Sequence, residues 1–397
     1  MKRLWTALVC LLFLLPMQTA AAENIVRIMW EPIEGAVLYE VILTADKDGG
    51  KDDAVWQDTC SANGIEIDAD IGGARYCRVR GIDYEHQAVS EWRTAERLTK
   101  AKRAGGVPEI LFAGGEHPLL YPVYTWIPVW GAVGYEIEMN DTESTSAYLS
   151  AAGARKIKVA GGAAFDYYDE EPALRAGVHC WRVRALYPDG VRSAWSRSGT
   201  FEVTHGDAVY AAIGDSITHG GGSVTHTPNE PAYDWTTYTG RKVKNLGLSG
   251  DVTAHIADRI AREAADCGAK IVFIMGGIND LRAGETAETV IANLARAVRE
   301  AKSVGLRPIL LTVPPVNPPL MTERMGYPLA PNWQTEQRRV NEWILAQMDS
   351  IDAAHAVTDE RGYLSADLTT DGLHPDSEGK RRIGEAVRIW LDEHDLP

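Results

Sequence analysis

Long apolar runs are scarce in this sequence. Beyond residue 22, none approaches the roughly 20 consecutive apolar residues that span a bilayer, so no transmembrane segment is expected there. The pronounced run, Leu4–Leu15, follows Lys2 and Arg3 and precedes the small residues Ala20–Ala22. This pattern is typical of a cleaved secretory signal, and we predict a signal peptide over residues 1–22 and an exported protein, periplasmic or extracellular. A retained N-terminal anchor is the alternative.

Cysteine is scarce as well. Of the five cysteines, Cys10 lies in the predicted signal, and the rest are too few for a disulfide scaffold and lack the close pairs of a zinc site. Cys60 and Cys77 fall in one predicted module, where a single disulfide stays open as an alternative. Cys180 and Cys267 fall in different regions and are expected to be ordinary, semi-buried thiols.

Basic residues are fewer than acidic ones. The 40 Lys and Arg against 55 Asp and Glu give a formal net charge of −15 at pH 7. Such a chain repels polyanions, so nucleic acid and anionic membrane surfaces are poor partners. The acidic cluster Asp169-Glu-Glu171 is expected to be a solvated turn.

Signatures of metal and phosphate sites are also missing. The glycines Gly220–Gly222 are not followed by Gly-Lys-Ser/Thr, and His219 and His226 lack the His-x-x-x-His spacing of a helical metal site. No metal and no cofactor are therefore expected.

Residues 24 to about 204 contain two similar units. In the first unit, the shared motifs are Trp30, Gly35-Ala-Val-Leu-Tyr39-Glu-Val, Cys77-Arg-Val-Arg80 and Ser90-Glu-Trp92. In the second they are Trp126, Gly131-Ala-Val-Gly-Tyr135-Glu-Ile, Trp181-Arg-Val-Arg184 and Ser193-Ala-Trp195. Self-similarity of this kind indicates tandem modules. The period-two alternation of apolar and polar residues within the shared motifs predicts antiparallel strands. We predict two small β-sandwiches, over residues 23–105 and 106–204.

Both units resemble fibronectin type III domains in their early Trp, their Gly-Ala-x-x-Tyr-Glu strand, their Arg-Val-Arg strand and their closing Ser-x-Trp. The aromatic residues Trp30, Tyr39, Trp126 and Tyr135 are expected to fill the two cores, with carbohydrate contact as the alternative.

From residue 205 to 397 the pattern changes to alternating strands and helices. Short apolar runs predict buried parallel strands at Val209–Ile213, Val243–Leu246, Ile271–Met275, Ile309–Val313 and Ala354–Thr358. Amphipathic helices fit between them, which predicts an α/β domain with a flavodoxin-like, doubly wound parallel sheet.

Polar motifs follow these strands. Ser216 follows the first strand, Gly250 the second and Asn279 the third, while Asp371-Gly-Leu-His374 follows the last. Because the carboxyl ends of parallel strands line one edge of a sheet, we expect these residues to converge on one crevice.

These four blocks, in this order, resemble the SGNH, or GDSL, hydrolase family, over about residues 206 to 397. The resemblance implies that Ser216 is the nucleophile and that Asp371 and His374 complete a catalytic triad. It also implies an oxyanion hole formed by the amides of Ser216 and Gly250 and the side chain of Asn279. The first block reads Gly-Asp-Ser-Ile instead of Gly-Asp-Ser-Leu, an apolar exchange. The segment 220–239 is less ordinary for the family, and the resemblance implies nothing about its contribution to substrate choice.

The chemistry of these side chains agrees with those roles. A serine hydroxyl needs an imidazole to take its proton, and the imidazole needs a carboxylate to fix its tautomer. His219, close to Ser216 in sequence, is expected to line the substrate pocket.

We expect a secreted serine esterase that hydrolyses carboxylic esters through an acyl-enzyme, with O-acetylated carbohydrate as the preferred substrate because sandwich modules and export suit an external polymer. The alternatives are a lipolytic enzyme of the lysophospholipase or thioesterase type and a non-catalytic glycan-binding or adhesion protein. The catalytic domain is expected to fold and act without the modules, from about Thr204 onward.

Overall fold

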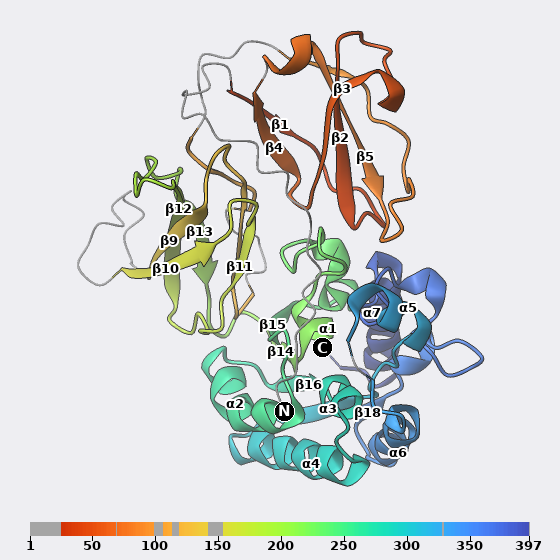
Figure 1. Ribbon diagram of the computed structural model, residues 1–397. Coiled ribbons are helices and arrows are strands. Elements are labelled where there is room, and N and C mark those ends of the chain that lie inside the picture. Colours follow the sequence, from red (N-terminus) through yellow and green to blue (C-terminus); the bar gives the residue numbers. More distant parts are fainter. Residues whose placement is uncertain are drawn as a thin grey trace, which may run out of the picture.

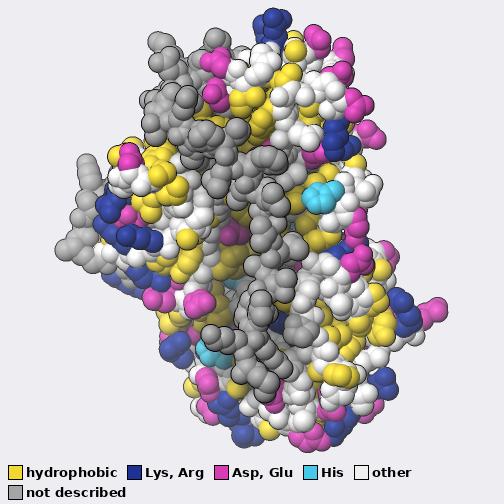
Figure 2. All heavy atoms as spheres, viewed as in Figure 1, with side chains coloured by type: hydrophobic (Ala, Val, Ile, Leu, Met, Phe, Trp, Pro, Cys, Tyr) yellow, Lys and Arg dark blue, Asp and Glu magenta, His cyan; other side chains and the backbone are white. Residues whose placement is uncertain are grey.

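Two β modules and an α/β domain make up the computed structural model (Figure 1). It describes residues 25–68, 70–98, 106–112, 119–141, 154–327 and 329–396. The predicted signal, residues 1–22, lies outside the described residues. Within the described ranges no helix is long and apolar enough to cross a membrane. Acidic and basic side chains lie interspersed around the edge of the face shown in Figure 2.

The first module contains two antiparallel sheets. One pairs β1 (Ile25–Met29) with β4 (Gly64–Asp68). The other has the order β3-β2-β5-β6, formed by Ala54–Cys60, Leu38–Thr44, Tyr76–Ile82 and Glu96–Arg97. Trp30 and Tyr39 pack edge to face in the core with ring centroids 5.3 Å apart.

The second module repeats this arrangement. One sheet has the order β11-β8-β7, formed by Asp166–Tyr168, Val123–Ile127 and Glu109–Ile110. The other has the order β10-β9-β12-β13, formed by Arg155–Ala160, Gly134–Asp141, Gly177–Leu186 and Gly199–Val203. Trp126 and Tyr135 are completely buried in its core, so the aromatic residues of both modules are core residues as predicted. The resemblance to fibronectin type III domains stays a prediction.

The repeated Arg and Trp residues form the same stack in both modules. The guanidinium of Arg80 lies 4.4 Å from the ring centre of Trp92, and that of Arg182 lies 4.6 Å from Trp195. Each arginine also pairs with a glutamate on the neighbouring strand, Glu40 in the first module and Glu138 in the second. These half-buried tryptophans are therefore held by cation–π contacts, which gives the repeated motif a structural role.

The four cysteines within the described residues are all free. Cys60 and Cys77 cannot pair because β3 and β5 lie on opposite sides of β2, where they face Tyr39 and Leu43. Two strand spacings alone place them at least about 9 to 10 Å apart, and the offset along β2 from Tyr39 to Leu43 adds to this, so they exceed the Cα separation of about 7 Å that a disulfide tolerates.

The third domain contains a five-stranded parallel sheet with the order β15-β14-β16-β17-β18. Its strands are Val243–Gly247, Tyr210–Gly214, Ile271–Met275, Arg307–Leu311 and Ser350–Ile351. In order of sequence this is the 2-1-3-4-5 arrangement of flavodoxin-like sheets, which confirms the predicted fold class.

One predicted strand is wrong. Ala354–Val357 forms a 3₁₀ helix, η5, and the fifth strand is the preceding Ser350–Ile351. The apolar side chains of Ala354 and Val357 are buried. An apolar run this short does not distinguish a buried strand from one buried helical turn.

The helices that flank the sheet begin with the four-residue α1 (Ser216–His219). The others are α2 (Thr253–Asp266), α3 (Ile278–Ala283), α4 (Ala287–Ser303), α5 (Pro318–Met325), α6 (Trp333–Leu345) and α7 (Ser377–Glu393). Helices α2 and α4 pack against each other, as do α4 and α6. Side chains such as Ile256, Val290 and Val387 close the core at the sheet.

Both modules dock on the third domain through the segment 220–239, which the sequence left without a role. Ser223 donates a hydrogen bond to the carbonyl of Ala36 (2.9 Å), and Asn229 donates one to the carbonyl of Val123 (2.7 Å). The segment includes the 3₁₀ helices η3 (Pro231–Tyr233) and η4 (Trp235–Tyr238). It therefore connects the first and second modules to the α/β domain.

Part of the second module also belongs to the core of the α/β domain. Leu120 and Tyr121, from the segment that leads into β8, pack with the buried side chains around β15 and α2. The Leu120 amide donates to the Asn245 carbonyl on the edge strand β15 (3.0 Å). This packing argues against the prediction that the α/β domain folds on its own from Thr204 onward.

Candidate active site

Ser216 lies two residues after the end of β14, at the first position of α1. The turn depends on Gly214, because a Cβ there would lie 2.1 Å from the carbonyl oxygen of Met275 on β16. Asp215 caps α1, with its carboxylate accepting from the Ile217 amide at 2.9 Å. Burial raises the pKa of Asp215 to about 6. The serine is thus fixed by a tight strand-to-helix turn at the carboxyl edge of the sheet.

Ser216, His374 and Asp371 lie in one hydrogen-bonded line. Ser216 Oγ is 2.9 Å from His374 Nε2, and His374 Nδ1 is 2.7 Å from Asp371 Oδ2. Since a carboxylate only accepts, Nδ1 carries the hydrogen and Nε2 accepts from the serine hydroxyl. The three residues that the sequence predicted for a triad are therefore together and correctly ordered for proton transfer.

Asp371 is held in its ionised form by its surroundings. Burial by itself would raise the pKa of this carboxyl, but the His374 ring and the backbone amides of His374 and Leu373 outweigh it and hold the pKa below its usual value. Gly372 makes the turn between Asp371 and His374 at φ 83°, and a Cβ there would lie 2.3 Å from the Met321 amide nitrogen.

Gly250 and Asn279 come from the neighbouring strands. Gly214, at the end of β14, is paired with Gly247 on β15 and Met275 on β16, so the loops that follow leave the sheet at the same level. Within the described chain, the amides of Ser216 and Gly250 donate no hydrogen bond to other protein groups. Both amides are therefore available to a ligand.

Asn279 is tied to the loop that carries Gly250. Its Nδ2 donates to the carbonyl of Asp251 (2.8 Å), and its Oδ1 accepts from Arg282 (3.0 Å), which fixes the orientation of the amide and leaves its second N–H free to donate. Gly250 has φ 83°, and a Cβ there would meet nothing within 4 Å. Glycine is needed here for its backbone conformation, which other residues rarely adopt.

The sequence predicted that His219 lines the substrate pocket, and this prediction is wrong. Its ring is completely buried, with Nε2 2.8 Å from the carbonyl of Tyr121 and Nδ1 2.9 Å from Ser249 Oγ. Burial lowers the pKa of His219 to about 4, so the ring is neutral near pH 7. Because the carbonyl can only accept, Nε2 carries the hydrogen and Nδ1 accepts from Ser249.

His226 gains a role that the sequence did not indicate, and the expected solvated turn is wrong for Asp169. His226 is buried in the module interface, 3.2 Å from the carbonyl of Ile33 and 3.0 Å from Glu230, and so has a docking role. Asp169 is not a solvated residue: its side chain is 2% exposed and pairs with Arg155.

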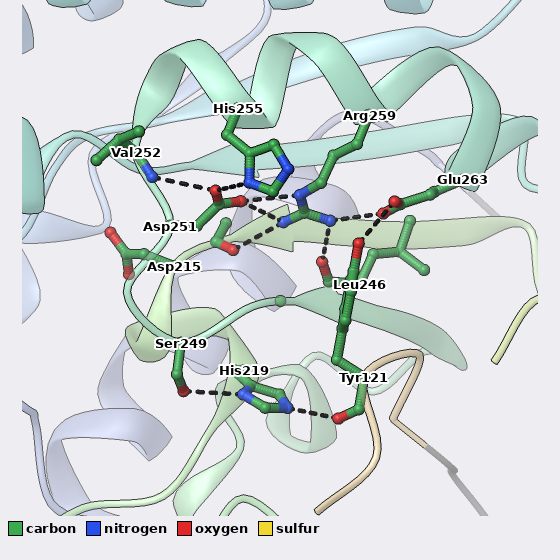
Figure 3. A network of polar contacts seen from close by, with 12 residues as sticks. Tyr121, Asp215, His219, Leu246, Ser249, Asp251, Val252, His255, Arg259 and Glu263 are labelled. Atoms are coloured by element: carbon green, nitrogen blue, oxygen red, sulfur yellow. Dashed lines mark hydrogen bonds and ion pairs between the residues drawn. The ribbon is translucent and has the colours of Figure 1, made fainter. Parts of the chain in front are cut away.

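A buried ionic network lies next to the loop between Ser249 and Asp251 (Figure 3). Arg259 on α2 pairs with Asp251 and with Glu263, and it donates to the carbonyls of Leu246 and Gly214 at 2.7 and 3.1 Å. The side chains of Arg259, Asp251 and Glu263 are at most 2% exposed. One guanidinium thus ties the ends of β14 and β15 to the following loop.

The sequence carries a signal of this network that its motifs do not include. On α2 the charged residues Arg259 and Glu263 stand beside Ile256, Ile260 and Ala264, which form the apolar face of that helix. Charged residues inside an apolar stripe are seldom buried unless they pair with each other. The spacing of Arg259 and Glu263, four residues apart, permits that pairing.

Lys380 is a second buried charge close to the candidate site. This α7 side chain is 0% exposed, and its Nζ donates to the carbonyl of Ile217 in α1 (2.6 Å). Burial lowers the pKa of Lys380 to about 8, while the carboxylates of Asp234, Asp215 and Asp371 act in the opposite direction.

We expect stability to depend on Lys380 in a pH-specific way. Between pH 8, where the folded form loses its proton, and the ordinary value of 10.5, only the unfolded chain binds the proton. The free energy of unfolding should therefore rise with pH in this window, by about 1.4 kcal/mol per unit. Urea unfolding of the wild type and Lys380→Met at pH 7 to 9.5 should show curves that diverge, whereas Lys242→Met, at an exposed site, should run parallel to the wild type. Parallel curves for Lys380→Met would contradict the assignment.

A turn of the first module lies at the edge of the candidate site. Arg324 of α5 donates to the carbonyl of Thr370 (2.6 Å) and to the carboxylate of Glu85 (3.2 Å), and its guanidinium lies 5.7 Å from the ring centre of Tyr84. Burial and the nearby charge of Asp371 raise the pKa of Tyr84 to about 12. The Tyr84-Glu85 turn thus lies within electrostatic reach of the triad carboxylate.

A flavodoxin-like sheet with a Ser-His-Asp line at its carboxyl edge defines the geometry of a serine hydrolase. Residues 212–382 match the family model described as GDSL-like lipase/acylhydrolase. The C-terminal domain of this chain is therefore a member of the GDSL-like lipase/acylhydrolase family, which acts on ester substrates.

Several solved structures are similar to this part of the chain. A lipase/acylhydrolase from Enterococcus faecalis is 23% identical, with 47% of this chain and 96% of that chain covered and a TM-score of 0.38. A catalytic mutant of an acetylxylan esterase from Geobacillus stearothermophilus is 20% identical, with 49% and 97% covered and a TM-score of 0.34. No curated protein matches the sequence.

Proposed function

We propose that this protein is an exported serine esterase that hydrolyses carboxylic esters through an acyl-enzyme, with O-acetyl groups on carbohydrate as its substrate. The observation that carries the proposal is the aligned trio, with Ser216 Oγ 2.9 Å from His374 Nε2 and His374 Nδ1 2.7 Å from Asp371. A hydroxyl in this position loses its proton to the imidazole as it attacks a carbonyl carbon.

In the first half of the reaction, Ser216 Oγ forms a bond to the ester carbonyl carbon while its proton passes to His374 Nε2. Asp371 stabilises the imidazolium that results. The imidazolium then gives the proton to the departing alcohol oxygen, which leaves an acyl-enzyme. In the second half, His374 takes a proton from water as the water oxygen attacks the acyl carbon. The bond from that carbon to Ser216 Oγ then breaks, Oγ takes the proton back from His374, and the carboxylic acid leaves.

The negative oxygen of each tetrahedral intermediate requires donors that are already in place. The amides of Ser216 and Gly250 and the free N–H of Asn279 suit this role, since they come from three neighbouring loops at one sheet edge. Each such donor contributes about 3 to 4 kcal/mol of transition-state stabilisation in acyl-transfer enzymes.

The preference for carbohydrate rests on the arrangement of the modules. The first module brings the Tyr84-Glu85 turn to Arg324, beside the segment that carries Asp371. A substrate larger than a simple ester would meet this turn as well as the catalytic domain. The net charge of −15 disfavours work on an anionic lipid surface, which supports a neutral polymer over a phospholipid.

A substrate panel tests the proposal. The purified protein should hydrolyse p-nitrophenyl acetate faster than the butyrate and octanoate esters, and it should release acetate from acetylated xylan. Faster hydrolysis of the octanoate, or of a lysophospholipid, would point to the lipolytic alternative. Absence of turnover on every ester, with the protein folded, would favour a non-catalytic glycan-binding or adhesion protein.

A further inference from the structure

Gly250 receives no packing support of its own. The residue is exposed, and a Cβ at this position would meet nothing within 4 Å. The direction of its amide is therefore determined by the two residues beside it, Ser249 and Asp251. If the Gly250 amide is an oxyanion donor, whatever holds these two neighbours also holds the donor.

Both neighbours are held by contacts that lead to the same residue, Tyr121. On one side, Ser249 donates to Nδ1 of His219 (2.9 Å), and His219 donates from Nε2 to the carbonyl of Tyr121 (2.8 Å). On this side the connection runs through one buried, neutral ring.

On the other side, the Tyr121 hydroxyl donates to Glu263 (2.7 Å), which pairs with Arg259 (2.6 Å). Arg259 in turn pairs with Asp251 (2.7 Å), and its guanidinium lies 5.3 Å from the ring centre of Tyr121. Figure 3 shows Tyr121 reaching from the His219 end of the network to the Glu263 end. The backbone carbonyl of Asp251 also accepts from the side chain of Asn279, so this branch reaches Asn279, the second oxyanion donor.

We propose that Tyr121, which comes from the second module, is a positioning residue for the oxyanion donors of the catalytic domain. The inference rests on the proposed function. The second module would then contribute directly to the rate on a small ester, because its Tyr121 holds the loop 249–251 from both sides. A tyrosine supplies both contacts at once, since its backbone carbonyl accepts from His219 and its hydroxyl, at the far end of a rigid side chain, donates to Glu263.

Two variants cut the two branches separately. Tyr121→Phe removes only the hydroxyl that contacts Glu263, and Ser249→Ala removes only the hydroxyl that contacts His219. Each should lower kcat on p-nitrophenyl acetate by about tenfold with KM within about twofold, because the donors act on the transition state more than on the bound ester. Ser249→Thr keeps a hydroxyl and should restore the rate.

Affinity for phenylboronic acid separates positioning from general loosening. Its adduct with a serine is tetrahedral and places an oxygen where the oxyanion forms, so the inhibition constant should rise in parallel with the fall in kcat. Tyr124→Phe is the matched control: that hydroxyl contacts Asp169 (3.4 Å) inside the second module, and its loss should leave kcat unchanged.

The outcomes are distinct. Wild-type kcat in both Tyr121→Phe and Ser249→Ala, or a fall in kcat without weaker boronate binding, would overturn the inference. If Tyr121→Phe does not fold, Ser249→Ala and Ser249→Thr decide alone. Wild-type activity in Ser216→Ala, measured in the same series, would instead show that the proposed function is wrong.

Discussion

Replacing Ser216 by Ala is expected to lower kcat/KM for p-nitrophenyl acetate by about 10⁴-fold or more while the protein stays folded. The hydroxyl is the only group aligned with His374 Nε2, at 2.9 Å, among the described residues. Members of a triad act as a unit, so losing the nucleophile removes nearly all of the contribution of the other two. What remains would come from oxyanion donors acting on water.

The matched control is Ser303→Ala. Ser303 is an exposed serine at the end of α4, where its hydroxyl bonds only to the carbonyl of Glu300 within the described chain, and its loss should leave the rate unchanged. His374→Ala should cost about as much as Ser216→Ala, whereas Asp371→Ala should cost less, since the imidazole keeps some productive orientation. Equal turnover by a folded Ser216→Ala protein would end the serine-esterase hypothesis.

The parts of this site that could be predicted are those carried by local sequence patterns. Ser216, Gly250 and Asn279 each lie two to four residues after an apolar strand, and the carboxyl ends of parallel strands must share an edge. His374 and Asp371 are three residues apart around Gly372, so their contact is local as well. These positions can therefore be predicted without knowing how the modules pack.

The docking of the modules could not be predicted for a physical reason. The acceptors that the segment 220–239 and His219 use are backbone carbonyls, those of Ala36, Val123 and Tyr121. Every residue has a carbonyl, so such a contact leaves no mark on the sequence of the accepting strand. The wrong fifth strand, Ala354–Thr358, has a different cause, because a short apolar run is equally compatible with a buried 3₁₀ turn.

The contacts between the second module and the catalytic domain change what is expected of a shortened chain. A chain of residues 205–397 lacks Leu120 and Tyr121, which the complete protein buries in the core of the catalytic domain. Losing the burial of Leu120 alone costs about 1.5 to 3 kcal/mol, and each hydrogen bond lost by buried Glu263 or His219 costs about 1 to 3 kcal/mol more. These losses approach the whole stability of a typical domain, about 5 to 15 kcal/mol.

We therefore expect residues 205–397 to unfold at a much lower urea concentration than the complete protein, or to fail to fold, and to lose at least about tenfold in kcat on p-nitrophenyl acetate where folded. The informative comparison is a chain of residues 106–397. It loses the contacts of Ser223 and Arg324 with the first module but retains Tyr121 at the network of Figure 3. It should keep most of the rate on the small ester and lose activity mainly on acetylated xylan, because the Tyr84-Glu85 turn is gone. If residues 205–397 matched the complete protein in both urea stability and rate, the second module would be a spacer, and Tyr121 would have no part in positioning the oxyanion donors.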